Sequence, residues 1–428
     1  MWPKRNSSGP HTDLQQVNWG RLPYVALLEI FRCLSNTDKL NASLACRAWQ
    51  LPFHEPMLWR RGRFRFNGVI EMRALYFACR MGSALRHITI DCSVGSGPVP
   101  QATKRSAKNL STFLSFLVDS GNAQLSTFRL THLDRFRRQW GEPDYDALRL
   151  LLAAQQGLVW LDLENAGLWP DTGFQILGLV GNSSGSKVQK LHIADFMLLE
   201  VNDDDDDIDE DPRVFSVLAS FTALTELSIS YDVLSDELLF LLGSTVTSTL
   251  SQISVVANCK VTQESQTSSR AWTHLCLKCP RLSASFQLKG VSRVQSVLVV
   301  LTPKTPLARL QLSTPGMYNN VNLALCLDHI VTNFHGYLQS LELNLHMVSL
   351  NAEGDLTRLV QQFPDLENLH VTSTRLNRRQ ELGVHRALRR TVTRQPGSRL
   401  KDVTLNGQKV SLETTWTSTL VDWLTEQL

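Results

Sequence analysis

The chain has 428 residues, and its 43 Lys and Arg residues nearly balance its 40 Asp and Glu residues, which argues against a dedicated nucleic-acid binder. Its first residues are polar rather than those of a secretory signal, and its longest apolar runs, such as 297–301, are far shorter than a membrane span. The eight cysteines are scattered among apolar neighbours, a pattern typical of free thiols in a reducing compartment. We therefore expect a protein of the cytoplasm, the nucleus or both, with no membrane and no nucleic-acid partner.

A helical unit is predicted near the N-terminus, at residues 17–65, after a polar segment at 1–16 that we expect to be disordered. Leu22-Pro23 opens its first helix, because a proline at a helix start leaves no intrahelical bond unmade. A second helix follows Asn36 to Asp38, which supply N-cap chemistry, and it is expected to end in Cys46-Arg47-x-Trp49. About forty residues cannot bury this much apolar surface alone, so a partner or the rest of the chain must cover it.

The residues of this unit resemble an F-box in their order and spacing. The resemblance lies in Leu22-Pro23, Cys46-Arg47, Trp49 and Leu58-Trp59, while Tyr24-Val25 and Asn41 depart from the family's common acidic and basic residues. It implies docking on Skp1, and on cullin-1 through Skp1, by a protein that performs no chemistry itself. The Skp1-binding residues it implies are Leu22, Pro23, Leu28, Ile30, Phe31, Leu34, Trp49 and Trp59. The alternative is an ordinary helical cap on a larger domain.

A repeated pattern follows, in which apolar residues stand at positions one, four and six. Its copies begin at Leu85, Leu125, Leu158, Val188, Leu224, Leu250, Leu307, Leu338, Leu366 and Leu400, with a poorer copy near Leu282. The alternating end of each copy predicts a short strand, and apolar residues at helical spacing predict helices at 148–155, 174–180, 237–242, 294–301 and 323–334. This alternation predicts an α/β leucine-rich repeat solenoid over residues 80–428, with parallel strands on the concave side and helices on the convex side.

The array is expected to be irregular. Its mean period is about 31 residues, above the usual leucine-rich range of roughly 20–29, and of the expected asparagine ladder only Asn165 is near its place. A doubly wound α/β domain is the alternative, but its strands are usually apolar on both faces. Here each predicted strand has a polar residue between its last two apolar residues. This pattern indicates that one face of each strand is exposed to solvent.

Candidate substrate-binding residues come from these polar positions, from the neighbouring Trp160 and from a group of arginines near the C-terminus. On the strands they are Arg129, Trp160, Asp162, His192, Glu342 and His370, and in the basic C-terminal region Arg386, Arg389 and Arg390 share one helical face. Arginine suits an acidic or phosphorylated segment, although a solvated convex face is the simpler interpretation.

The chain as a whole resembles the substrate-receptor subunits of SCF (Skp1–cullin–F-box) ubiquitin ligases. Finer features further resemble the F-box only protein 33 and 39 group: Trp19 ahead of Leu22-Pro23, Leu58-Trp59-Arg60 leading to Phe66-x-Gly68, and residues 235–239. The resemblance implies a subunit that binds Skp1 through the F-box and an unknown protein substrate through the repeats. The alternative is a leucine-rich repeat scaffold or adaptor that acts independently of ubiquitination.

Two further motifs leave alternatives open. Eight acids between Asp203 and Asp211 predict a solvated, disordered loop at 200–212. The loop is either a tolerated insertion, a docking surface for a basic partner, or an intramolecular contact with the basic C-terminal region. Cys276-x-x-Cys279 has the spacing of a metal or redox pair, but no second cysteine pair follows it. Packing in the core is therefore the simpler interpretation, and a metal or redox role is the alternative. Nucleophile elbows, phosphate-binding glycine loops and HExxH are absent from the sequence, so we expect no catalytic residues, metal or cofactor.

Overall fold

The computed structural model describes residues 19–67, 71–93, 100–197, 213–246, 248–259, 267–315, 323–346, 352–374, 378–394 and 399–410. The predictions of disorder for residues 1–16 and for the acidic loop at 200–212 lie outside these described residues.

The N-terminal unit is helical, as predicted. It consists of η1 (Trp19–Arg21), α1 (Tyr24–Cys33), α2 (Asn36–Ser43), α3 (Arg47–Phe53) and η2 (Pro56–Trp59). Pro23 stands at the N-cap of α1, and the Ser35 hydroxyl caps α2 by accepting from the Asp38 amide at 3.2 Å. One detail of the prediction was wrong: Cys46 does not lie in a second helix but in extended backbone that caps α3, because α2 already ends at Ser43.

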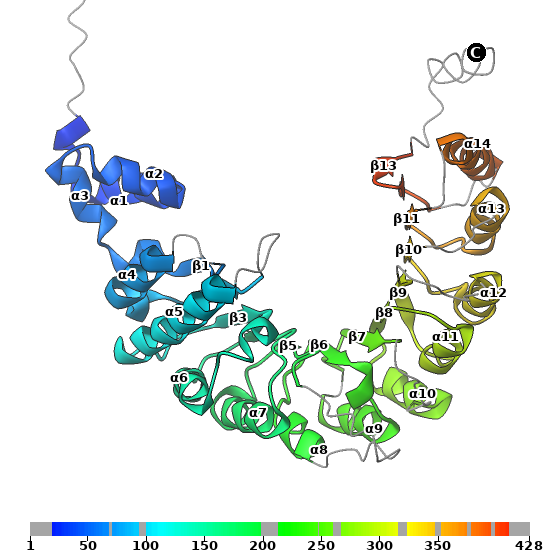
Figure 1. Ribbon diagram of the computed structural model, residues 1–428, viewed down its shortest axis with the longest axis horizontal. Helices are drawn as coiled ribbons and strands as arrows, with labels where there is room; N and C mark the ends of the chain where they lie inside the picture. The colour runs from blue at the N-terminus through cyan, green and yellow to red at the C-terminus, as the bar shows by residue number, and fades with distance from the viewer. Residues whose placement is uncertain are drawn as a thin grey trace, which may run out of the picture.

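One curved sheet runs through the rest of the described chain, with its strands in sequence order (Figure 1). Neighbouring strands are parallel, apart from the final pair, which is antiparallel. The strands are β1 (Arg61–Arg65), β2 (His87–Asp91), β3 (Thr127–Thr131), β4 (Trp160–Asp162), β5 (Lys190–His192), β6 (Glu226–Ser230), β7 (Gln252–Asn258), β8 (Ser283–Lys289), β9 (Leu307–Ser313), β10 (Ser340–Leu345), β11 (Asn368–Ser373), β12 (Asp402–Leu405) and β13 (Gln408–Lys409). Every predicted repeat, from Leu85 to Leu400, forms one of the strands β2 to β12.

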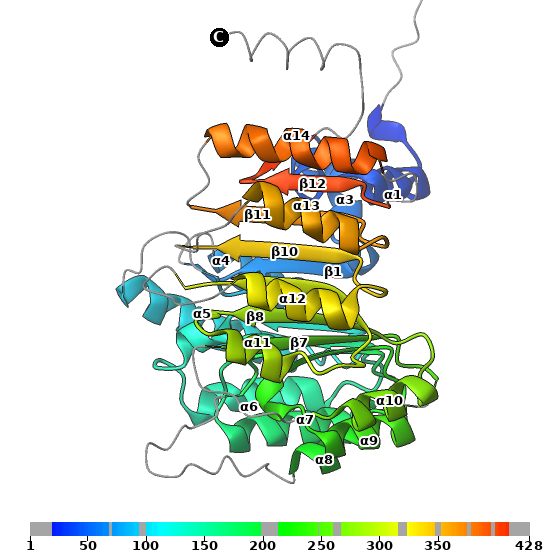
Figure 2. The same ribbon diagram turned by 90° about the vertical axis from the view of Figure 1, so that its right-hand side faces the viewer.

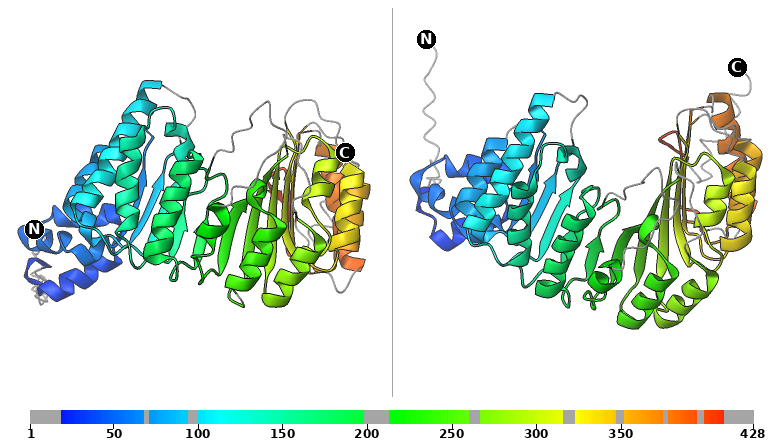
Figure 3. Two further views of the ribbon diagram at one scale, coloured as in Figure 1. Left: turned by 90° about the horizontal axis from the view of Figure 1, so that it is seen from below. Right: turned by 60° about the horizontal axis from the view of Figure 1, so that its bottom comes forward.

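The helices cover the outside of the arch, and the strands line its inside (Figures 1 and 3). They are α4 (Glu71–Met81), α5 (Pro100–Asp119), α6 (Glu142–Ala153), α7 (Pro170–Ser184), α8 (Arg213–Leu218), α9 (Asp236–Thr245), α10 (Ser269–Lys278), α11 (Val294–Val300), α12 (Leu323–Phe334), α13 (Ala352–Gln362) and α14 (Arg378–Arg394). One continuous core of buried side chains fills the space between the two layers. This is the predicted solenoid, with parallel strands concave and helices convex.

The sheet begins earlier than predicted, at Arg61 rather than after residue 80. η2 runs almost directly into β1, and the Trp59 ring lies against Phe77 of α4 with ring centroids 5.3 Å apart. The helical unit and the first repeat therefore share aromatic packing, and β1 joins the sheet within the range expected for the helical unit.

A polar ladder joins the early repeats at the ends of their helices. The buried Gln155 side chain donates to the carbonyls of Asn122 at 2.9 Å and Leu151 at 2.7 Å, and it accepts from the Leu125 amide at 2.8 Å. The Ser184 hydroxyl then donates to the Gln155 carbonyl at 2.6 Å. These side chains pair buried backbone groups that the strands leave unpaired.

Candidate functional site

The N-terminal helical unit has its own small core. Phe31, Leu58 and Trp59 are buried, and the Trp59 indole N–H donates to the Phe53 carbonyl at 2.7 Å. Phe31 and Trp59, two of the predicted Skp1-binding residues, therefore pack inside the unit. Of the others, Pro23 is exposed, and five are half-buried: Leu22, Leu28, Ile30, Leu34 and Trp49.

Other apolar side chains of this unit are much more exposed. Val25 is 69 % exposed, Leu44 76 % and Leu51 65 %, and Trp19, Tyr24 and Leu40 are also exposed. Sequence reasoning missed these residues because it followed the motif, whereas exposure depends on how the three short helices pack. So much exposed apolar surface within some forty residues is typical of a protein-binding site.

Polar contacts fix the entry of the chain into this unit. The Trp49 indole N–H donates to the Trp19 carbonyl at 2.9 Å, and the Tyr24 hydroxyl donates to the Glu55 carboxylate. The hydrogen bond to Glu55 raises the pKa of Tyr24. Burial lowers the pKa of Lys39, whose ammonium lies 5.4 Å from the centre of the Trp59 ring.

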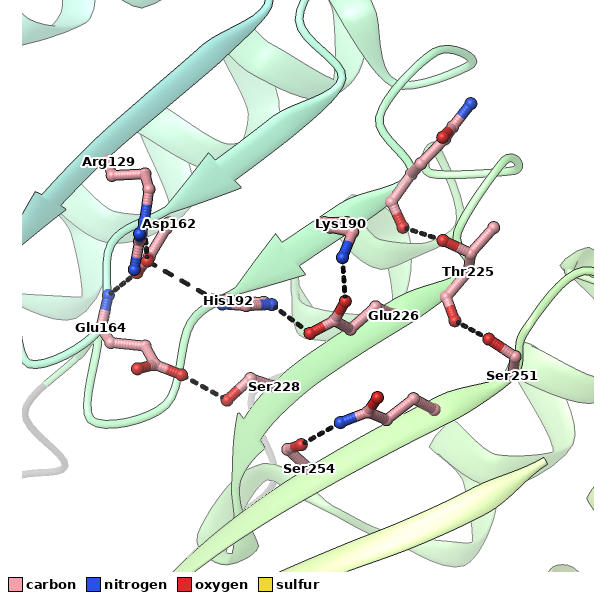
Figure 4. A network of polar contacts seen from close by, with 12 residues as sticks. Arg129, Asp162, Glu164, Lys190, His192, Thr225, Glu226, Ser228, Ser251 and Ser254 are labelled. Atoms are coloured by element: carbon pink, nitrogen blue, oxygen red, sulfur yellow. Dashed lines mark hydrogen bonds and ion pairs between the residues drawn. The ribbon is translucent and has the colours of Figure 1, made fainter. Parts of the chain in front are cut away.

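Four predicted residues of the concave face meet in one cluster, and Figure 4 shows three of them, Arg129, Asp162 and His192. The Arg129 Nε donates to the Asp162 carboxylate at 2.7 Å, and its guanidinium lies 4.6 Å from the centre of the Trp160 ring. His192 approaches the same carboxylate, with Nδ1 at 3.9 Å, and its ring contacts Trp160 at 5.8 Å between centroids. The structure thus brings together Arg129, Trp160, Asp162 and His192, and we call them the Trp160 cluster.

Asp162 was predicted on the solvated face, and that prediction was wrong: its side chain is only 1 % exposed. Because β3, β4 and β5 lie in register at these positions, the two neighbouring side chains close over it. The Glu164 amide also donates to the Asp162 carboxylate at 3.2 Å, so this buried charge is both paired and hydrogen-bonded. The Trp160 indole nitrogen is buried and has no acceptor among the described residues.

The network continues onto the next strand. The Lys190 ammonium lies 2.6 Å from one Glu226 oxygen and 5.3 Å from the centre of the Trp160 ring, and His192 Nε2 lies 3.0 Å from the other Glu226 oxygen (Figure 4). Burial alone would raise the pKa of Glu226, but Lys190 and His192 together outweigh it and lower that pKa. Lys190 and Glu226 were not among the predicted residues, although strand alternation places both on this face.

The remaining predicted residues lie elsewhere. Glu342 on β10 accepts from Gln311 at 3.1 Å and from Asn344 at 2.8 Å, and His370 on β11 contacts the Thr404 hydroxyl at 2.7 Å. Arg386, Arg389 and Arg390 belong to α14 on the convex side, where Arg390 is exposed and the other two are half-buried. The structure does not bring these five residues to the Trp160 cluster.

A polar hollow of about 220 Å³ lies beside the cluster, over β6 to β9. Ser228, Ser254 and Ser285 line it as in-register neighbours, so small side chains create the space. Its charged groups already have partners: Lys289 lies 2.9 Å from Asp195, and Glu164 accepts from Ser228 at 2.6 Å.

The cysteines are free thiols with no cross-link between them. Cys276 is half-buried on α10, and Cys279, which caps that helix, is buried with its thiol 3.6 Å from the Val246 carbonyl. Within the described ranges, no three His, Cys, Asp or Glu side chains gather as a metal site would require. Within the same ranges, no helix combines the length and the apolar character needed to span a membrane.

Comparisons with known proteins agree with this architecture. The family model described as F-box-like matches residues 19–65. F-box/LRR-repeat protein 21 of Bos taurus is 26 % identical over 250 residues, which cover 56 % of this chain and 54 % of the relative. Its counterpart of Mus musculus is 25 % identical over 234 residues, covering 53 % and 49 %. The chain thus spans about half the length of the curated relatives it matches.

A solved structure, described as the complex of Rad7 and Elc1 in yeast, aligns over 90 % of this chain and 93 % of its own. At 14 % identity and a TM-score of 0.35, that alignment is too loose to support an argument. The finer resemblance to the F-box only protein 33 and 39 group stays a prediction. The chain carries an N-terminal F-box-like domain, followed by a leucine-rich repeat solenoid, and is similar to F-box proteins with leucine-rich repeats.

Proposed function

We propose that this protein is the substrate-recognition subunit of an SCF ubiquitin ligase, working in the cytoplasm, the nucleus or both. The F-box-like domain binds Skp1, and through Skp1 cullin-1, while the concave face of the solenoid binds a protein substrate. The observation that carries the proposal is the F-box-like match at residues 19–65 over helices that leave Val25, Leu44 and Leu51 exposed.

In this role the protein is an adaptor and forms no bond with the substrate. It holds substrate lysines near the ubiquitin-loaded enzyme, which raises their effective concentration. A solenoid suits the task because its stacked repeats share one core and keep a fixed distance between the two ends. The Trp160 cluster is the proposed substrate contact, since it combines an aromatic ring with charged groups of both signs.

Co-purification with Skp1 tests the first step. Leu22→Ala with Pro23→Ala, and separately Leu44→Asp with Leu51→Asp, are expected to abolish Skp1 binding while the repeats stay folded by circular dichroism. Leu277→Asp on α10 is the matched control, because Leu277 is 75 % exposed and lies on the solenoid. Undiminished Skp1 binding by both double variants would refute the assignment.

A reconstituted ubiquitination assay tests the second step against the alternative of a scaffold independent of ubiquitination. Proteins that co-purify with the wild-type chain are offered to the chain with Skp1, cullin-1 and the conjugating enzymes. Ubiquitination of a co-purified protein that is lost with the Leu44→Asp/Leu51→Asp variant supports the role of substrate receptor. A stable complex that forms with Skp1 but never promotes modification supports the scaffold.

A further inference from the structure

Strand β1 is the first strand of the sheet and carries a row of arginines. Arg61, Arg63 and Arg65 alternate with Gly62 and Phe64 along the strand. The alternate positions of β1 lie opposite Ile88 and Ile90 of β2, which are fully buried, so Phe64 faces the core and the arginines face the concave side. Successive guanidinium groups therefore start roughly 6.6 Å apart along one line.

No strand among the described residues covers the outer edge of β1. In the described part of the chain the strand pairs only with β2, and all three arginines are exposed even though the F-box-like domain lies at this end of the arch (Figures 1 and 2). The bonds to β2 use alternate residues: the Phe66 amide donates to the Asp91 carbonyl at 3.0 Å, and the Arg60 carbonyl accepts from the His87 amide at 2.9 Å. The amide and carbonyl groups of the three arginines in between consequently point away from β2.

The positive charge of this row is largely uncompensated. Within the described residues Arg61 and Arg63 have no acidic partner, and Arg65, whose side chain is 70 % exposed, reaches Asp91 only at 4.0 Å. His87 lies opposite Arg61 on β2. Burial, together with the positive charges of Arg61 and Arg86, lowers the pKa of His87.

We propose that the outer edge of β1 binds an extended acidic segment of a partner protein as an added strand. An added strand would place alternate side chains about 4.5–5.5 Å from Arg61, Arg63 and Arg65, so acids at every second residue would pair with the row. Free amide and carbonyl groups favour a polypeptide over a nucleic acid, which has no matching backbone. Charge on a strand edge also keeps copies of the chain apart, and the same charge selects an acidic partner.

The test measures fluorescence anisotropy of a short labelled peptide that alternates Glu and Val, added to the full chain without Skp1. Three comparison probes separate the contributions: the same peptide with Lys for Glu, the same peptide N-methylated at alternate amides on the pairing side, and an oligothymidine of equal charge. The variant is Arg61→Glu with Arg63→Glu. Its control is Arg73→Glu with Arg105→Glu, which changes net charge equally at exposed positions on α4 and α5.

Saturable, salt-sensitive binding of the Glu peptide is expected. It should weaken at least about tenfold, or about 1.4 kcal/mol, in the Arg61→Glu/Arg63→Glu variant. The control variant should bind as the wild type does, and the Lys and N-methylated peptides should bind at least about tenfold more weakly than the Glu peptide. Equal binding by the two variants would overturn the site, and equal binding of the N-methylated peptide would overturn strand addition. Tighter binding of the oligothymidine would mark a nucleic-acid site instead. Because Skp1 is absent, none of these outcomes depends on the proposed ligase function.

Discussion

The replacement Arg129→Ala tests whether the Trp160 cluster stabilises the solenoid through one buried carboxylate. Removing one partner of a buried ion pair costs about 3–5 kcal/mol, since the other charge stays buried and unpaired. Asp162 is buried here, but Arg129 is 33 % exposed and Asp162 keeps the Glu164 amide, so the lower end applies, about 3 kcal/mol. That loss increases the local opening equilibrium of β3 to β5 roughly a hundredfold.

Native-state hydrogen exchange, read by mass spectrometry on peptides covering β3 to β5, measures this opening directly. Arg309→Ala is the matched control, because Arg309 is an exposed arginine on the concave strand β9 with no acidic partner among the described residues. The double variant Arg129→Ala/Asp162→Ala should recover much of the lost protection, because it removes the orphaned charge. The reasoning fails if Arg129→Ala behaves like Arg309→Ala, or if the double variant opens as readily as the single one.

Three further predictions concern the ladder, the Glu226 ion pairs and the thiols. Gln155→Leu leaves three buried backbone groups without partners and should lower the free energy of unfolding by about 3 kcal/mol, read as a lower urea midpoint. The control Gln156→Leu, at an exposed position, should leave the urea midpoint unchanged. Because its folded pKa is lowered from the ordinary value of 4.5, Glu226 stabilises the fold above that pH, and this contribution disappears as the pH falls through the folded pKa. The urea midpoints of wild type and Glu226→Gln should therefore differ at neutral pH and converge in acid; a difference that persists in acid would contradict the assignment. Iodoacetamide should label the exposed Cys33, Cys46 and Cys79 in the native chain, but it should label Cys92, Cys259 and Cys326 only after unfolding. Burial raises the pKa of these last three thiols, that of Cys259 to about 12. Peptide mapping of the labelled chain checks this prediction.

Local pattern was sufficient to predict the repeats. Each strand from β2 to β12 begins at or just after the first apolar residue of a copy, and even the poor copy near Leu282 was correctly placed. Its imperfect spacing coincides with a register shift between β8 and β9 at Ala284 and Ser285. Helix and strand periodicity depends on neighbours in sequence, which is why it could be read directly.

Features that depend on neighbouring strands could not be read in this way. β1 was missed because Arg61 to Arg65 carry arginine at alternate positions and lack the repeat's apolar opening, although period-two alternation was present. Asp162 was expected in solvent because its burial comes from side chains on β3 and β5. Likewise, Phe31 has the same apolar character as the exposed Val25, and only the packing of the short helices separates core from surface.

The sequential order of the strands also determines how this chain can fold. Each strand from β2 to β12 pairs with the strands that precede and follow it along the chain, so sheet formation does not wait for a distant segment. Contacts of this kind have short closing loops, and arrays built from them can grow from any formed repeat. During synthesis the F-box-like domain and β1 emerge before the other repeats, and each later repeat can add to a finished edge.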